Sequence, residues 1–367
     1  MEVNCRKEEL FKGVQLVQNA ISPRSTLPVL SNILFESNGE GLRLSSTDLE
    51  IGIRCHVKAD IRSGGATTVP ARLLNEFLRT LEDDQELSIK IDDSHKIEIR
   101  SGRDRCMLMG LPKEDYPVLP EFSQDRSLPI SQKMIKEMIR KAAFAVSTDE
   151  NRYVLNGVNF ITDKGRITLI STDGRRLAYI QRDCEDKKSI INAIIPSKAI
   201  NELARILNTE EKDVGIQMGF TENQVTFKYK DTIILSRLID GSFPNFDQII
   251  PKNHDIQLRF NTRKLLSATQ RAAVGTLEKG GSVRLNLSPG KFQMFASSQG
   301  RVEAESELEI DYKGEPFSIA FNPAYMIDVL RALETDEIFM ELTTPLNPGV
   351  IHPIGDDHYK YVLMPMS

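Results

Sequence analysis

The sequence contains one short pattern three times at nearly constant spacing. The copies begin at residues 44, 169 and 295 and read LSSTDLEIGI, LISTDGRRLA and FASSQGRVEA. Thr47, Thr172 and Ser298 occupy the same place in these copies and are 125 and 126 residues apart. In the middle copy, Asp-Gly between alternating apolar residues is typical of a β-hairpin turn. A repeat of this length in a chain of 367 residues predicts three similar domains.

Hydrophobic periodicity predicts the same order in each repeat: a helix, strands, a second helix and further strands. Apolar residues at helical spacing predict six helices, over 6–20, 71–81, 132–146, the residues after Ser197, 262–277 and 324–333. Alternating apolar runs predict strands between them, over 32–37, 41–45, 50–57, 86–91, 96–101, 105–109, 157–162, 166–171, 176–181, 214–218, 224–229, 232–238, 282–287, 291–296, 301–308, 338–342, 349–353 and 360–364.

The stretches 111–129 and 240–255 are rich in proline and are expected to be linkers with little secondary structure. These linkers place the domains at residues 1–122, 128–250 and 254–367. The predicted fold class is α+β, with helices on one face of antiparallel sheets in each of three tandem domains.

Positive charge is concentrated in the predicted helices. The whole chain has a formal net charge of -5, which by itself does not suggest a nucleic-acid partner. The six predicted helices nevertheless carry a net +9, so the remainder carries -14. Two interpretations stay open: ordinary solvated helix faces, or helices that together face one polyanion and contact its phosphates without reading sequence.

No catalytic or cofactor motif is found in the sequence. A phosphate-binding GxxxxGK[ST] loop is absent, and none of the five histidines is spaced as a metal ligand. Asp356, Asp357 and His358 form a polar hairpin turn more readily than an acid–base or metal cluster. Ser171-Thr-Asp173 recurs as Ser46-Thr-Asp48, which favours a role in the turn. We therefore expect no enzyme activity, no cofactor and no metal.

The cellular setting follows from what the chain lacks. Four cysteines without a CxxC pair are typical of a reduced protein, and they are interpreted as small buried hydrophobic residues. No apolar run is long enough to span a membrane, and the N-terminus has no secretory core. A cytoplasmic protein is expected.

Several short motifs, spread over the whole chain, share their order and spacing with one family. They are Arg24-Ser-Thr-Leu-Pro-Val-Leu30, Ser46-Thr-Asp-Leu-Glu50, Ala66-Thr-Thr-Val-Pro-Ala-Arg72, Arg152-Tyr-Val-Leu-Asn-Gly157, Thr172-Asp-Gly-Arg-Arg-Leu177, Asp240-Gly-Ser-Phe-Pro244 and Tyr361-Val-Leu-Met-Pro-Met366. Together they resemble the bacterial sliding clamps, the processivity (beta) subunits of DNA polymerase III.

The resemblance implies a head-to-tail homodimer that forms a closed ring of six domains around duplex DNA, lined by twelve helices. Such a ring would tether the replicative polymerase for processive synthesis. It would also dock the clamp loader, translesion polymerases and mismatch-repair proteins. By the same resemblance, four positions would touch DNA: Arg24, Arg72, Tyr153 and Lys198. The family often has a second aromatic residue after Tyr153, where this chain has Val154.

Two further sets of residues are implied by the resemblance. A hydrophobic pocket for partner peptides would be formed by Leu155, Thr172, Gly174, Arg175, Arg176, Leu177, Pro244, Ile249, Asn322, Tyr325, Leu346, Val362, Met364, Pro365 and Met366. Methionine suits such a pocket because its side chain adapts to different ligands. The dimer interface would pair a strand carrying Arg103, Arg105, Cys106 and Leu108 with residues Val274, Leu277, Glu303 and Glu305 of the partner chain.

Two other functions stay open on the residues alone. The chain could be a hydrolase whose site is built from scattered residues around Asp48 or Asp173. It could also be a repeat scaffold that binds proteins but not DNA. Residue counting does not fix the assembly either, since two chains of three units and three chains of two units both give six.

Overall fold

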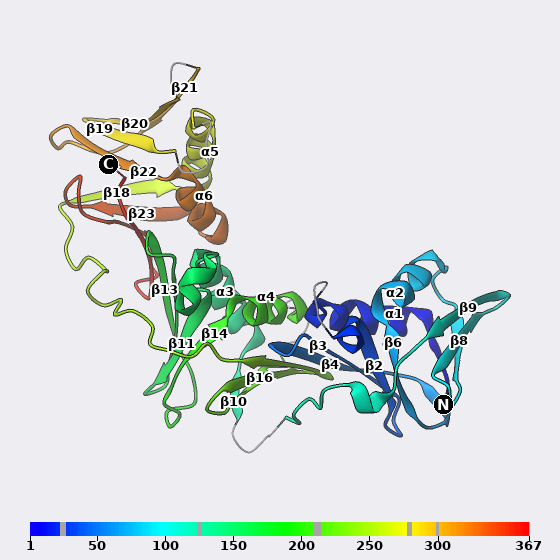
Figure 1. The fold of residues 1–367 in the computed structure, drawn as a ribbon. Coiled ribbons are helices and arrows are strands. Elements are labelled where there is room, and N and C mark those ends of the chain that lie inside the picture. Colours follow the sequence, from blue (N-terminus) through cyan, green and yellow to red (C-terminus); the bar gives the residue numbers. More distant parts are fainter. Residues whose placement is uncertain (23–26, 123–126, 209–213, 277–280, 299–300, 367) are drawn as a thin grey trace. The chain divides into compact units, whose positions relative to one another are not determined.

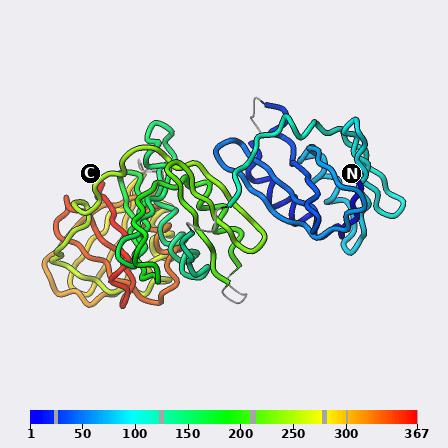
Figure 2. Tube along the Cα trace, turned by 90° about the horizontal axis from the view of Figure 1, so that it is seen from below, coloured from blue at the N-terminus to red at the C-terminus, as the bar shows by residue number. Residues whose placement is uncertain are grey.

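The computed structural model describes residues 1–22, 27–122, 127–208, 214–276, 281–298 and 301–366. Its contacts divide the chain into two compact units, which we describe separately (Figure 1). The first unit contains residues 1–133 and 198–238, and the second contains 134–197 and 239–367. The chain therefore passes from one unit to the other three times (Figure 2). In the described part of the chain, no helix has the length and apolar content that crossing a membrane requires.

The first unit contains two antiparallel sheets. The smaller has the strand order β5-β1-β7-β8-β9 and the larger has the order β10-β15-β16-β17-β4-β3-β2-β6. The strands of the smaller sheet are β1 (Glu2–Arg6), β5 (Asp60–Ser63), β7 (Glu86–Ile91), β8 (Lys96–Ser101) and β9 (Asp104–Met109). Those of the larger are β2 (Asn32–Ser37), β3 (Leu42–Thr47), β4 (Ile51–Val57), β6 (Ala66–Pro70), β10 (Ser127–Ile130), β15 (Ile216–Phe220), β16 (Gln224–Tyr229) and β17 (Thr232–Arg237).

Helices of the first unit pack on these sheets through small and aliphatic residues. The helices are α1 (Lys7–Val17), α2 (Ala71–Thr80) and α4 (Ser197–Ile206), of which α4 has its first residue in the second unit. Gly13 lets α1 approach β3 and β4 closely: a Cβ at this position would lie 2.6 Å from Val57 and 3.0 Å from Leu44. Leu10, Val14 and Val17 of α1 are fully buried.

The second unit also has two antiparallel sheets. The larger has the order β14-β11-β12-β13-β25-β24-β23-β18, and the smaller has the order β21-β20-β19-β22. The larger contains β11 (Gly157–Asp163), β12 (Arg166–Thr172), β13 (Arg176–Asp183), β14 (Ile191–Pro196), β18 (Ile256–Asn261), β23 (Glu337–Leu342), β24 (Gly349–Pro353) and β25 (Tyr359–Leu363). The smaller contains β19 (Val283–Ser288), β20 (Lys291–Ser298), β21 (Val302–Glu309) and β22 (Phe317–Phe321).

Side-chain caps and buried hydroxyls fix the helices of the second unit. These helices are α3 (Gln132–Ala142), which begins in the first unit, α5 (Thr262–Ala273) and α6 (Pro323–Ala332). Asn261 and Asn322 cap α5 and α6, because each side-chain oxygen accepts a hydrogen bond from a backbone N–H of the first turn. Tyr359 in β25 donates its hydroxyl to the carbonyl of Lys141 in α3.

The six predicted helices are confirmed; most end earlier than predicted, and the sixth is shifted by one residue. The first helix begins after Arg6 because β1 ends there, and it closes in a 3₁₀ turn over 18–20. The third also ends in a 3₁₀ turn, over 143–145, and the fifth ends at Ala273. All predicted strands are present to within two residues of their predicted ends.

Strands β1, β5, β6, β10, β14, β18 and β22 were not predicted. Four of them, β6, β14, β18 and β22, each lead into a helix that was predicted. β5 is a short, largely exposed edge strand, and β1 and β10 have four or five residues each, so none of these three has a long alternation. β10 also lies partly in the stretch 111–129, for which we expected little secondary structure. Pro129 is tolerated because β10 is an edge strand of its sheet.

Candidate functional site

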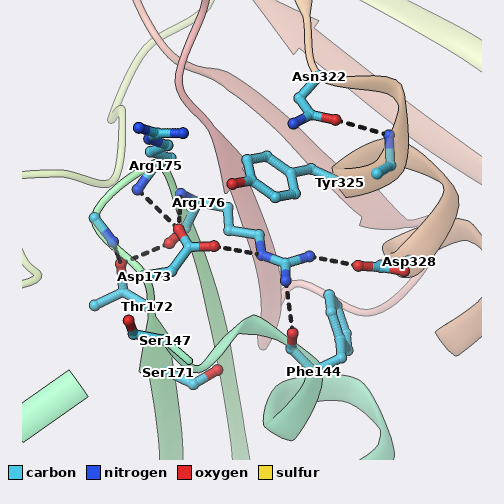
Figure 3. A network of polar contacts seen from close by, with 12 residues as sticks. Phe144, Ser147, Ser171, Thr172, Asp173, Arg175, Arg176, Asn322, Tyr325 and Asp328 are labelled. Atoms are coloured by element: carbon cyan, nitrogen blue, oxygen red, sulfur yellow. Dashed lines mark hydrogen bonds and ion pairs between the residues drawn. The ribbon is translucent and has the colours of Figure 1, made fainter. Parts of the chain in front are cut away.

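Thr172 and Asp173 hold the turn between β12 and β13, while the Ser171 hydroxyl donates to the carbonyl of Ala142 (Figure 3). Thr172 Oγ1 donates to the carbonyl of Arg176 at 2.6 Å and accepts from the N–H of Gly174 at 3.0 Å. Asp173 Oδ1 accepts from the N–H groups of Arg175 and Arg176 at 2.9 and 3.1 Å. The structure confirms that Thr172 and Asp173 serve the turn.

The first copy of the pattern makes the same bonds between β3 and β4. Thr47 Oγ1 donates to the carbonyl of Ile51 at 2.8 Å and accepts from the N–H of Leu49 at 3.0 Å. Asp48 Oδ1 accepts from the N–H groups of Glu50 and Ile51 at 3.0 and 2.8 Å. The repeat seen in the sequence is therefore a repeat of hydrogen bonds, and both candidate carboxylates of the hydrolase alternative are used by turns.

Arg176 is buried next to this turn and joins it to α6 (Figure 3). Its Nε donates to Asp173 Oδ2 at 2.9 Å, and its Nη1 donates to Asp328 Oδ2 at 2.7 Å. Its Nη2 donates to the carbonyl of Phe144 at 2.8 Å, and the guanidinium lies 4.4 Å from the ring centre of Tyr325. Such a stacked, fully bonded arginine fixes the position of the β13 backbone.

The electrostatic environment keeps Arg176 charged. Burial alone would lower the pKa of Arg176, but the oxygens of Tyr361, Asp328 and Asp173 outweigh it and raise the pKa. The same burial raises the pKa of Tyr361, so that this phenol stays neutral.

An apolar cluster lies on the same strands. Ile170, Leu177 and Val362 are buried at its centre, in β12, β13 and β25. Leu177 and Val362 are directly paired across two strands. Partly buried residues pack against this centre, namely Ile161, Tyr179, Phe243, Phe246, Ile249 and Ile250. We call these nine residues the apolar cluster.

Two features continue from the apolar cluster. A cavity of about 300 Å³ begins at Ile161 and is lined further by Asp163, Lys164, Arg166, Thr168 and Gln181. The C-terminal tail follows Val362 of the cluster. Met364 N–H donates to the carbonyl of Arg175 at 2.9 Å, and Met366 N–H donates to the carbonyl of Ala320 at 2.8 Å. The tail is thus held by its backbone, which leaves its methionine side chains half-buried.

Most of the residues predicted for the peptide pocket come together around Arg176 and Leu177. They are Thr172, Gly174, Arg175, Asn322, Tyr325, Ile249, Val362 and Met364. Leu155 lies at the end of a 3₁₀ segment, where its carbonyl accepts from the N–H of Ser147. Pro365 and Met366 follow Met364 along the tail, while Pro244 is exposed on the segment that carries Phe243 and Phe246. Leu346 is 89% exposed in a turn.

Sequence reasoning missed six residues of the apolar cluster, namely Ile161, Ile170, Tyr179, Phe243, Phe246 and Ile250. Ile170 and Tyr179 are directly paired on adjacent strands, and Ile170 lies two residues before Thr172. Strand alternation could therefore have found them. The aromatic residues of the segment 243–250 lie among prolines, where no periodic pattern indicates burial.

Three of the four positions expected to touch DNA lie within the described residues. Arg72 is exposed on α2 and lies 3.8 Å from Glu76, while Lys198 on α4 forms an ion pair with Asp48 at 2.5 Å. Tyr153 is 58% exposed in the second unit. Arg24 lies outside the described residues.

Two cations of the predicted basic helices face inward. Lys7 of α1 is buried and its Nζ lies 2.6 Å from Asp83. Lys141 of α3 is buried and bonds Glu137 at 2.6 Å and Asp356 at 3.4 Å. These two lysines cannot contact phosphate, so the net helix charge of +9 overstates the charge available to an external polyanion.

Five of the residues expected at the dimer interface lie on two edge strands: Arg105, Cys106 and Leu108 on β9, and Glu303 and Glu305 on β21. Arg103 directly precedes β9, and Val274 follows α5. β9 is the outer strand of the five-stranded sheet, and β21 is the outer strand of the four-stranded sheet. Arg103, Arg105, Glu303 and Glu305 are exposed, and Arg105 forms an ion pair with Glu98 of its own sheet. The remaining predicted residues differ in exposure: Cys106 is half-buried, Leu108 is buried in its own unit and Val274 is 65% exposed. Leu277 lies outside the described residues.

Within the described ranges, no group of three or more His, Cys, Asp or Glu side chains is placed to hold a metal ion. Asp356 lies in the turn between β24 and β25, as predicted for a polar hairpin, and its carboxylate bonds Arg182 and Lys141.

Comparison with known proteins identifies the class. Family models match nearly the whole chain: the N-terminal domain of the DNA polymerase III beta subunit over residues 1–120, the central domain over 129–245 and the C-terminal domain over 247–367. The chain belongs to the DNA polymerase III beta subunit family.

Individual relatives agree with this assignment over their full length. The beta sliding clamp of Haemophilus influenzae is 31% identical, with all of both chains covered. A Pseudomonas aeruginosa sliding clamp solved with griselimycin bound has a TM-score of 0.94 at 31% identity, covering 100% of this chain and 99% of that one. The Bacillus subtilis sliding clamp has a TM-score of 0.94 at 29% identity, with the same coverage. The chain consists of three tandem clamp domains and is a processivity clamp for DNA polymerase.

Proposed function

We propose that two copies of this chain join head to tail in a closed ring around duplex DNA. The observation that carries the proposal is the pair of edge strands with opposite charge. β9 pairs only with β8, and β21 only with β20, among the described strands. Arg103 and Arg105 lie at the first edge, and Glu303, Glu305, Glu307 and Glu309 are exposed along the second.

Pairing β9 of one chain with β21 of the other would remove both edges and match their charges. Each edge lies in a different terminal clamp domain, so the contact is heterologous, and it makes a ring when its rotation closes. A closed ring needs no tight DNA contact, because it is held by topology while weak phosphate contacts let it slide. Arg24, Arg72, Tyr153 and Lys198 are the contacts we propose.

The apolar cluster and the tail are the proposed docking site for the polymerase. Leu177 and Val362 form its floor, Arg176 fixes the turn at its edge, and Met364 offers an adaptable apolar wall. Binding of a short polymerase peptide here would hold the polymerase near DNA at high effective concentration. The clamp loader, translesion polymerases and mismatch-repair proteins would use the same site.

Replacing Met364 by alanine tests this docking site. We expect Met364→Ala to lower the affinity for a peptide from the C-terminal tail of a replicative polymerase by about tenfold, because a half-buried apolar side chain is lost. Calorimetric titration measures the affinity, and the melting temperature should stay within about 2 °C because the Met364 backbone bond remains. An unchanged titration would exclude Met364 from the site.

Three further attributes belong to the proposal. The domain bounds are 1–122, 128–250 and 254–367. The chain acts in the cytoplasm and catalyses no reaction of its own, since its family consists of processivity factors. The rival scaffold function, without DNA, has no specific observation in its favour.

A further inference from the structure

The first unit contains a counterpart of the apolar cluster that has different chemistry. In the second unit, Ile161 pairs with Thr168, and Ile170 pairs with Tyr179. In the first unit, the residues 125 positions earlier make the same pairs: Glu36 with Arg43, and Ser45 with Arg54. These positions are therefore equivalent in the two units, because they share both the strand pairing and the 125-residue offset of the repeat.

The equivalent residues have changed from apolar to polar. Ile161, Ile170, Leu177 and Tyr179 correspond to Glu36, Ser45, Gly52 and Arg54. Gly52 provides room for a side chain from another segment: a Cβ there would lie 2.9 Å from Leu119 Cδ2. The segment 116–121 therefore lies over these strands, as the segment 243–250 packs against the apolar cluster.

A cavity of about 290 Å³ lies at this place. Its lining includes three cations, Arg43, Arg54 and Lys113, together with the apolar Leu34 and Leu119. Glu36 neutralises part of this charge, since Lys113 lies 2.6 Å and Arg43 2.8 Å from its carboxylate. Burial would raise the pKa of Glu36, but these hydrogen bonds outweigh it and lower the pKa, so Glu36 stays ionised.

Besides Glu36, the carboxylates of Glu114 and Glu121 line this cavity. Glu121 Oε2 lies 2.8 Å from Arg54 Nη1, and Glu121 Oε1 lies 3.5 Å from Arg43 Nη1. The Glu121 side chain is 72% exposed, whereas that of Arg54 is 9% exposed. Because the Glu121 side chain lies largely in water, a carboxylate of another chain can reach Arg54 in its place.

Two buried polar atoms show that the cavity is not fully satisfied by its own chain. Arg54 Nε and Ser45 Oγ have no hydrogen-bond partner among the described residues, although both residues are more than 90% buried. Both residues line the cavity. Unpaired buried donors cost free energy, and a ligand that accepts their hydrogen bonds recovers it.

The cavity continues as a groove. A second cavity of about 180 Å³ shares Pro117, Val118 and Leu119 with the first and extends along Leu49 to Arg237. Val118 is almost fully exposed between them. The two cavities together are lined by both charged and apolar side chains, which suits a peptide better than a single small anion.

We propose that this groove binds a short acidic peptide of a partner protein, whose carboxylate replaces Glu121 on Arg43 and Arg54 and whose apolar neighbours lie along the segment 117–119. The site is separate from the apolar cluster, and it neither requires nor contradicts the docking proposed there. It gives each clamp chain a second docking position, selective for acidic rather than purely apolar peptides.

The chain's own sequence supplies a probe. Residues 119–122 read Leu-Pro-Glu-Phe, and a tetrapeptide of this sequence, with a neutral dye at its N-terminus and an amidated C-terminus, has glutamate as its only carboxylate. Fluorescence anisotropy of this peptide measures binding to the full-length protein. We expect the variant Glu121→Gln to bind it about fivefold more tightly than the original chain, because the competing carboxylate is gone.

Matched variants locate the peptide. In the Glu121→Gln background, Arg43→Gln should weaken binding about fivefold, and the half-buried Arg43 can be replaced without disturbing the core. Arg62→Gln is the control, because Arg62 is exposed, pairs with Glu2 and lies outside the groove. The peptide Leu-Pro-Gln-Phe should bind at least fivefold more weakly than Leu-Pro-Glu-Phe.

Several results would overturn the proposal. The peptide could bind the original chain and Glu121→Gln with equal affinity, or Arg43→Gln could leave its affinity unchanged. The glutamine peptide could bind as tightly as the glutamate peptide. N-acetylglutamate amide or duplex DNA could compete as strongly as the unlabelled peptide. Loss of binding in Met364→Ala would place the peptide in the apolar cluster and would also refute the second site. Failure of the polymerase peptide to bind the apolar cluster would leave this test unaffected, so the two proposals fail separately.

Discussion

Leu49 occupies a backbone position that the second repeat gives to glycine. Its φ is +77°, and φ is +86° at Gly174, 125 residues later. A side chain in this left-handed region costs about 1 kcal/mol, because the Cβ approaches the following carbonyl. The hydrogen bonds from Thr47 and Asp48 impose the conformation in spite of this cost.

Leu49→Gly should therefore stabilise the first unit by about 0.5–1 kcal/mol, since strain is relieved and the half-exposed side chain contributes little. Leu49→Ala is the control, because it removes the side chain but retains the strained Cβ. Urea unfolding followed by circular dichroism measures both variants. A destabilised glycine variant would show that the leucine side chain outweighs its strain.

Arg176 offers a second prediction at the residue scale. Arg176→Met removes the charge that neutralises Asp173 and Asp328, and we expect a loss of about 3 kcal/mol in unfolding free energy. Arg259→Met is matched to it, because Arg259 also pairs with a carboxylate, Glu337, but on the surface. The surface change should cost less than about 1 kcal/mol. Similar losses in the two variants would contradict the structural role given to Arg176.

A network of charges joins α3, β13 and the turn before β25. Arg182 lies 2.8 Å from Glu137 and 2.6 Å from Asp356, and Lys141 bonds both carboxylates. Burial would raise the pKa of each carboxylate, but the hydrogen bonds and charges of Arg182 and Lys141 outweigh it. Both pKa values are therefore lower in the folded protein than their ordinary values of 4.5 and 3.8.

These depressed pKa values predict a direction of pH dependence. A carboxylate whose pKa is lower when folded stabilises the fold above its unfolded pKa, and this stabilisation is lost as the pH falls through the folded pKa. The unfolding free energy should thus decline below about pH 4.5. In Asp356→Asn, the difference in unfolding free energy between pH 7 and pH 3 should be smaller by about 1 kcal/mol. Unfolding curves at both pH values measure it. An equal pH dependence in the variant would contradict the network's role.

The sequence predicted elements where a clear period exists. The apolar stripes of all six helices appear at their predicted places, and so does each hairpin that contains the repeated pattern. Strands β1, β5 and β10 lack such a period because they are short, whereas β18 was missed although its residues alternate. Counting charges wrongly included Lys7 and Lys141 among the cations available to DNA. Both lysines are buried against an acidic partner, Asp83 or Asp356, that is distant along the chain and so cannot be identified from the sequence.

For the candidate site, the resemblance supplied Leu177, Val362 and Tyr325, and the structure brings them beside Arg176 or into the apolar cluster. Phe243 and Phe246 could not be predicted, because their burial comes from contact with strands some 70 residues earlier rather than from local pattern. The cavity of about 290 Å³ lined by Leu119 could not be predicted either, because it depends on the pairing of the strands that carry Glu36, Ser45 and Arg54.

At the scale of the whole molecule, the proposed ring depends on the charges of two sheet edges. Arg105→Glu would place a carboxylate opposite Glu303 and Glu305 and should weaken the dimer at least tenfold. Light scattering over a dilution series should give twice the 41.4 kDa chain mass for the original chain, and a mass nearer one chain for the variant. Arg62→Glu, at the opposite edge of the same sheet, is the control. Equal masses at every concentration would exclude this pairing.

The most direct test of the account is retention on circular DNA. The clamp is assembled on a nicked circle by a clamp loader, separated from free protein at high salt, and measured before and after the circle is cut once. A protein ring that encircles the DNA stays on the circle at high salt. It leaves after the cut, because it can then slide off the free ends of the linear DNA. Equal retention on circular and linear DNA, or loss from both at high salt, would show ordinary electrostatic binding and contradict the ring.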